Sequence, residues 1–127
     1  MRSCTVMIST KADGQNSEIV REGEMELFPR AAKIVYHEEN ALVKVSLQGE
    51  NAEVIRDGDY SLALFLESGK TTAGKIGIGG NSGEISTVTH AIEYKIAEDF
   101  AVVRLRYDLL IGAERQKMEL RLLAKVK

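Results

Sequence analysis

The chain has 127 residues, the length of a single domain, and its 44% hydrophobic and 28% charged residues are typical of a globular rather than a disordered protein. Seventeen Lys and Arg stand against nineteen Asp and Glu, so the net charge of −2 leaves no basic field for a nucleic-acid backbone. We therefore expect one globular domain over residues 1–127 that does not bind nucleic acid.

The N-terminal segment shows no targeting or membrane signal. Residues 1–10 lack the apolar stretch of a signal peptide, and no apolar run in the chain approaches the roughly 20 residues of a membrane helix. The single cysteine, Cys4, excludes an intrachain disulfide, which fits a reducing compartment. These features favour a cytoplasmic protein that binds no membrane.

From residue 33 onward, apolar side chains recur at every second position, which is the period of a strand with one buried and one solvated face. The alternating segments are 33–39, 42–48, 52–57, 61–66, 88–96, 103–109 and 117–126. Short turns rich in Gly, Asn and Asp separate them. Such short connections predict antiparallel hairpins between sequence neighbours.

Six of the eleven glycines lie between Gly69 and Gly83. Neither a phosphate loop nor a dinucleotide fingerprint fits this segment, because Leu64 and Ser82 stand where those motifs require glycine. The segment is typical of a weak, bulged strand. A second interpretation is a mobile flap beside the barrel that admits a ligand.

The C-terminal residues 113–126 contain good helix formers and have two interpretations. In a helix, the alternating Met118, Leu120 and Leu122 would wrap around the axis instead of forming a stripe. In a strand they share one face, so we predict a strand. An antiparallel meander of this length tends to close on itself, because closure removes its exposed edges. The sequence thus predicts an all-β fold, a single antiparallel up-and-down barrel of about eight to ten strands.

Several short motifs occur in the order of a known family. They are Tyr36-His37-Glu38, Val54-Ile55-Arg56-Asp57-Gly58, Gly83-Glu84-Ile85, Leu105-Arg106-Tyr107-Asp108-Leu109 and Gly112. In this order the chain resembles, over most of its length, the YwiB-like family of small bacterial β-barrels. The resemblance implies a calycin (lipocalin-like) barrel. It implies no chemistry, because the family has no established function.

Strand parity places six polar side chains inside the barrel. They are Tyr36, Glu38, Arg56, His90, Tyr94 and Tyr107. Charges in an interior cost several kcal/mol each unless they are paired, so we expect Glu38 and Arg56 to form an ion pair. One interpretation is a buried polar network that fixes the register. The other is a pocket for a small polar or amphipathic ligand in the barrel mouth or interior.

The sequence contains no pattern typical of a catalytic or metal site. Cys4, His37 and His90 lack the spacing of zinc ligands, and no nucleophile-elbow motif occurs. We therefore assign no catalytic residue, metal ligand or cofactor and favour a non-catalytic protein that binds a small molecule. The alternative is a structural or protein-interaction module with a packed interior, and a hydrolase or isomerase acting through Glu38 or His90 ranks third. A homodimer through outward-facing Phe28 and Phe65 is a further hypothesis.

Overall fold

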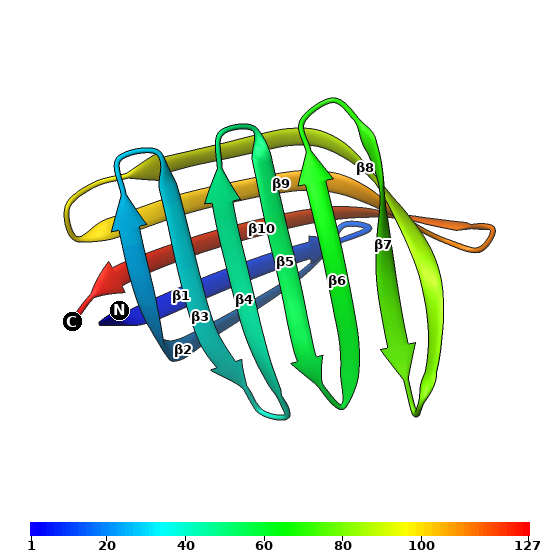
Figure 1. The fold of residues 1–127 in the computed structure, drawn as a ribbon, viewed down its shortest axis with the longest axis horizontal. Coiled ribbons are helices and arrows are strands. Elements are labelled where there is room, and N and C mark those ends of the chain that lie inside the picture. Colours follow the sequence, from blue (N-terminus) through cyan, green and yellow to red (C-terminus); the bar gives the residue numbers. More distant parts are fainter.

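Ten β-strands joined by short turns make up the computed structural model, which describes residues 1–127 (Figure 1). The strands are β1 (Arg2–Ala12), β2 (Gln15–Phe28), β3 (Ala31–Glu38), β4 (Ala41–Gln48), β5 (Asn51–Gly58), β6 (Tyr60–Glu67), β7 (Thr71–Ile78), β8 (Asn81–Ile96), β9 (Phe100–Ile111) and β10 (Glu114–Val126). Each pairs antiparallel with its sequence neighbours, and β1 also pairs with β10, which closes the barrel. The predicted antiparallel barrel is therefore confirmed. Nowhere does the structure contain a helix with the length and apolar character needed to cross a membrane.

The barrel wall has two layers whose strands cross at a steep angle. In Figure 1, β2 to β7 stand upright in front, while β1, β9 and β10 run across behind them. Two long strands belong to both layers. Residues 15–25 of β2 pair with β1 and residues 23–28 pair with β3, whereas β8 pairs first with β7 and then with β9.

Gly23 lies where the two ladders of β2 overlap. A Cβ atom at this position would press against the carbonyl oxygen of Val35 and approach Tyr36 Cβ and Val6 Cγ2 to 3.2 Å. The close approach of neighbouring strands at this corner therefore requires a residue without a side chain.

The shortest pairing between neighbouring strands of the barrel is that of β6 with β7. Their ladder has only four residue pairs, from Tyr60–Ile78 to Ala63–Lys75. Beyond it, the Thr72 hydroxyl donates to the Phe65 carbonyl and lies 2.8 Å from the Thr87 hydroxyl. The expected bulge in the glycine-rich segment is wrong, because β7 pairs with β8 in unbroken register.

The centre of the barrel is filled by one cluster of 23 buried hydrophobic residues. The largest side chains without solvent contact come from opposite walls and include Met25, Ile34, Leu64 and Leu105. The two chain ends lie side by side, with the Lys127 amide donating to the Ser3 carbonyl at 3.3 Å. A packed centre leaves the two open ends and the outer wall as places where chemistry can occur.

Candidate functional site

The structure divides the six predicted interior residues into three groups. Tyr36, Glu38 and Arg56 meet at one end of the barrel, and the buried Tyr107 lies close enough to Tyr36 to influence its ionisation. Tyr94 lies at the opposite end, and His90 lies outside the wall. The sequence therefore identified one real cluster and two residues that do not belong to it.

Arg56 organises the first end of the barrel. Its Nη1 donates to Asp59 Oδ1 at 2.8 Å and to the Tyr60 carbonyl at 3.0 Å, and its guanidinium stacks 3.8 Å from the centroid of the Tyr60 ring. Its Nε lies 3.6 Å from Glu38 Oε2, so the expected ion pair is present. The pair is only partly enclosed, because 12% of the Arg56 side chain and 30% of the Glu38 side chain are exposed.

The ionisable groups at this end have shifted pKa values with clear causes. The hydrogen bond from Arg56 lowers the pKa of Asp59. Burial, followed by the negative charge of Glu38, raises the pKa of Tyr36 well above its usual range. Burial raises the pKa of Tyr107 to about 12. Both phenols therefore stay protonated at neutral pH and can act as hydrogen-bond donors.

A hollow of about 490 Å³ opens at this end of the barrel, and we call it the mouth. Its lining residues are Ile8, Thr10, Ser17, Ile19, Arg21, Tyr36, Glu38, Glu39, Asn40, Arg56 and Asp59. The Nε of Arg56 is buried and has no hydrogen-bond partner. The hydroxyl of Thr89 also lacks a partner, but this residue is not part of the mouth lining. Buried polar groups are rarely left unpaired, so the Arg56 nitrogen indicates a place in the mouth for an additional polar partner.

Five of the eleven residues that line the mouth come from a part of the chain where no strand was predicted. Thr10, Ser17 and Arg21 lie on β1 and β2, which precede residue 33. A signal was present, because Glu22, Glu24 and Glu26 alternate with smaller or apolar residues. β2 was not predicted because this segment is rich in charged residues, and because the apolar inner face of the strand is short and interrupted by Gly23.

The prediction that His90 points into the barrel is wrong. A β-bulge between Thr89 and Ala91 adds one residue to β8, so the inward parity of Ile92 and Tyr94 does not extend back to His90, which directly follows the inward-facing Thr89. His90 lies on the outer face with Nε2 3.2 Å from Asp108 Oδ2, and Arg115 also donates to this carboxylate. Burial acts to raise the pKa of Asp108, but the hydrogen bonds from Arg115 and His90 outweigh it and lower the pKa.

Tyr94 connects two turns at the end of the barrel opposite the mouth. Its hydroxyl donates to the carbonyl of Gly49 at 2.9 Å and lies 3.3 Å from that of Arg30, so it contacts the β4–β5 and β2–β3 turns together. This side chain is inside the barrel, as predicted. Its hydroxyl is occupied by backbone groups, which points to a structural role.

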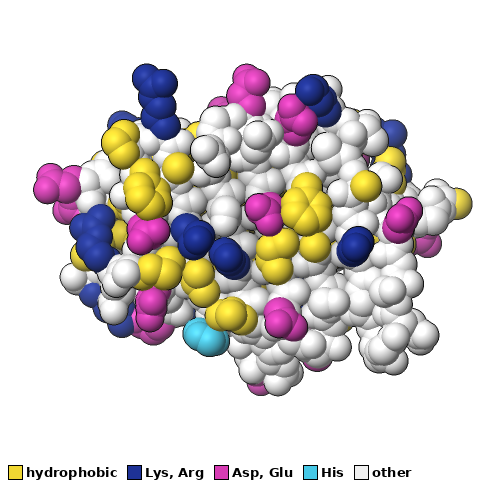
Figure 2. Space-filling model, in the orientation of Figure 1, with side chains coloured by type: hydrophobic (Ala, Val, Ile, Leu, Met, Phe, Trp, Pro, Cys, Tyr) yellow, Lys and Arg dark blue, Asp and Glu magenta, His cyan; other side chains and the backbone are white.

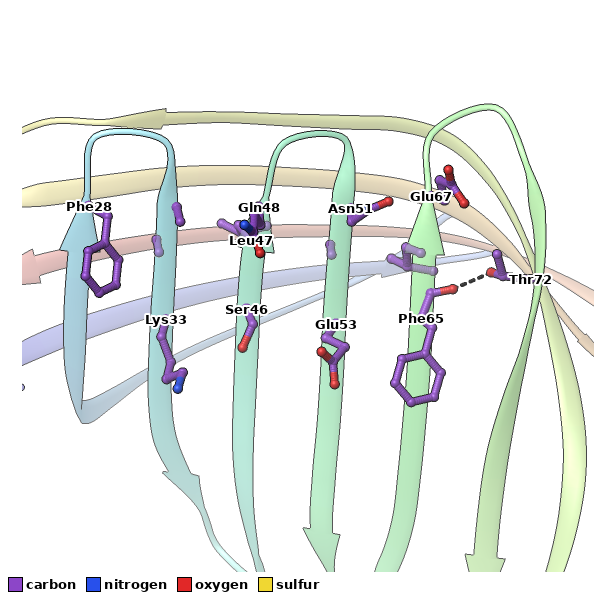
Figure 3. A pocket seen from close by; sticks show the side chains of 14 residues that line it. Phe28, Lys33, Ser46, Leu47, Gln48, Asn51, Glu53, Phe65, Glu67 and Thr72 are labelled. Carbon is purple, nitrogen blue, oxygen red and sulfur yellow. Dashed lines mark hydrogen bonds between the residues drawn. The ribbon is translucent and has the colours of Figure 1, made fainter.

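A second hollow, of about 470 Å³, lies on the outer wall across β2 to β6 (Figure 3). Phe28 and Phe65 stand at its two ends, with exposed fractions of 48% and 43%. Lys33, Ser46 and Glu53 lie between them as neighbours in one register row. The outward direction predicted for both phenylalanines is confirmed.

Comparison with known proteins agrees with this fold. Residues 3–122 match the family model described as a domain of unknown function, DUF1934. A solved structure, that of the ywiB protein from Bacillus subtilis, superposes with a TM-score of 0.87 over 99% of this chain and 92% of that chain, at 17% sequence identity. The resemblance to the YwiB-like family is thus confirmed. No curated protein sequence matches the chain.

Proposed function

The chain belongs to the DUF1934 family of β-barrels, and on that premise we propose that it is a non-catalytic protein that binds a small ligand at its mouth. The hollow of about 490 Å³ carries this proposal, because its lining contains Tyr36, Glu38 and Arg56, and the buried Nε of Arg56 has no hydrogen-bond partner. Concave sites with a few convergent polar groups are the usual form of small-molecule sites.

The chemistry of the lining restricts the ligand. Glu38 accepts hydrogen bonds, Arg56 and the Tyr36 hydroxyl donate them, and Ile8 and Ile19 supply apolar surface. A small molecule with both donor and acceptor groups and a short apolar portion matches this lining. The packed centre supports binding in the mouth rather than deep in the interior, since 23 buried hydrophobic residues fill the space below.

A cytoplasmic location completes the proposal. The lone Cys4 is fully buried in β1, and burial raises the pKa of its thiol. A buried, protonated thiol has no disulfide function, which fits a protein of a reducing compartment.

Native mass spectrometry tests the proposal directly. The wild-type protein, purified gently from its own cells, should carry an additional small mass that is released on denaturation. Glu38→Gln should lose most of this mass, while Glu53→Gln, an exposed change on the outer wall, should retain it. A wild-type protein without any added mass, even after incubation with a metabolite extract of those cells, would exclude the mouth as a ligand site.

A protein-interaction module is the second candidate function. It is supported by the packed interior and by the exposed Phe28 and Phe65 at the two ends of the outer hollow. Exposed aromatic residues around a hollow are typical of protein contacts. Loss of partner binding in Phe28→Ser/Phe65→Ser with an unchanged mass spectrum would favour this function over the first.

A further inference from the structure

A continuous apolar row crosses four strands on the outer face of the rear layer. Register pairs Val20 of β2 with Met7 of β1, Met7 with Leu123 of β10, and Leu123 with Val102 of β9. Val20, Met7 and Val102 are 56%, 52% and 43% exposed, and the row lines a hollow of about 420 Å³. The opposite face, shown in Figure 2, instead intersperses apolar side chains with charges.

The rows on either side of this apolar row carry a defined order of charges. One flanking row reads Glu18, Ser9, Arg121, Arg104 from β2 to β9. The other reads Glu22, Thr5, Lys125, Phe100 in the same strand order. Each row thus has its acidic residue on β2 and its basic residues on β9 or β10.

We propose that this face binds a second copy of the chain about a two-fold axis that runs along the strands between β1 and β10. Such an axis reverses the strand order, so Val20 faces Val102 of the second copy and Met7 faces its Leu123. In the first flanking row, Glu18 then faces Arg104. In the second, Glu22 faces Phe100 and Thr5 faces Lys125, so no two like charges meet.

The other simple two-fold axis, along the apolar row, does not fit the charges. It would bring Glu18 against Glu22 and Arg121 against Lys125, and like charges in contact are unfavourable. The order of charges along the two flanking rows is therefore complementary to a second copy of the chain, and only in the first of these two orientations. The mouth lies at the end of the barrel and stays open in this arrangement.

Cross-linking tests the orientation. Val20 and Val102 of one chain are three strands apart, about 14 Å at the usual strand spacing, but they face each other across the proposed axis. A short bis-maleimide should therefore join Val20→Cys/Val102→Cys into covalent dimers, while neither single variant forms covalent dimers. Wild type serves as the control, because its Cys4 is buried. Efficient cross-linking of Val20→Cys alone would overturn this arrangement.

Sedimentation measurements test the surface itself. We expect wild type to be dimeric and Met7→Lys to be monomeric, whereas Phe28→Ser/Phe65→Ser stays dimeric. Glu18→Arg should weaken the dimer at least tenfold and Glu26→Arg, an exposed change further along β2, should not. A wild type that is monomeric at every concentration, or a dimer that survives Met7→Lys, refutes the proposal.

Discussion

A single guanidinium group connects three segments at the mouth of the barrel. Arg56, on β5, contacts Glu38 at the end of β3 and also Asp59 and Tyr60 around the β5–β6 turn. Its loss therefore removes the ion pairs with Glu38 and Asp59 and the hydrogen bond to the Tyr60 carbonyl.

We expect Arg56→Met to lower the free energy of unfolding by about 1–2 kcal/mol, because the hydrogen bonds to Asp59 and to the Tyr60 carbonyl are lost, while the partner carboxylates remain partly solvated. The control Lys44→Met, an exposed change on β4, should alter it by about 0.5 kcal/mol or less. Urea unfolding measures both values. Equal stability of the two variants would mean that the mouth is held by other contacts.

The ionisation of Asp108 should make the free energy of unfolding depend on pH in the acid range. Because its pKa is lower in the folded protein than its ordinary value of 3.8, its ionised form stabilises the fold above that value. This contribution disappears as the pH falls from about 4 through the lowered pKa. Asp108→Asn should be less stable at pH 7 by about 1–2 kcal/mol and should lose less stability on acidification. Parallel acid-unfolding curves for the variant and wild type would contradict this expectation.

At the scale of single strands, alternation predicted most of the wall. The segments 33–39, 42–48 and 52–57 correspond closely to β3, β4 and β5, and the C-terminal segment is a strand, as predicted. Period two is a reliable signal because a half-buried strand must alternate. The predicted neighbours Glu38 and Arg56 followed from parity alone.

Alternation gives the wrong direction for a side chain where a β-bulge inserts an extra residue into a strand. The bulge at His90 separates the inward positions Thr87 and Thr89 from the inward positions that follow it. It lies where β8 has left β7 and pairs with β9 alone, a long-range feature that local sequence does not reveal. The first two strands were also missed. In β2 the bend at Gly23 interrupts the apolar positions of its inner face, whereas Cys4, Val6 and Ile8 of β1 alternate without interruption and gave a signal that was not used.

The corner of β2 gives a prediction about glycine. Gly23→Ala should destabilise the protein by about 2–3 kcal/mol, because the added methyl group meets the Val35 carbonyl and well-packed neighbours. Gly83 is the matched control, since its Cβ would find only Ile76 Cγ2, at 3.9 Å. Gly83→Ala should leave the melting temperature unchanged or raise it slightly. A tolerated Gly23→Ala would show that the two ladders can separate at the corner.

At the scale of the whole molecule, the stability of the wall should not be uniform. The β6–β7 ladder has four residue pairs, whereas β9 and β10 pair over twelve. The segment from Leu64 to Gly74 should open by local fluctuation far more often than the rear layer.

Hydrogen exchange checks this difference. Amides of residues 64–67 and 71–74 should exchange much faster than those of β9 and β10, which depend on global unfolding. This is also the test of the flap interpretation, extended to residues 74–83. Uniform protection around the barrel would rule out a weak seam.

The adjacency of β1 and β10 means that chain order is not essential to this architecture. A short flexible connection could join Lys127 to Met1 without moving either strand, since their backbones already share a hydrogen bond. New ends could then be cut between Gly79 and Gly80, at the tip of an exposed hairpin. Such a circular permutant should refold to the same closed wall, because closure depends on which strands are neighbours and not on where translation begins.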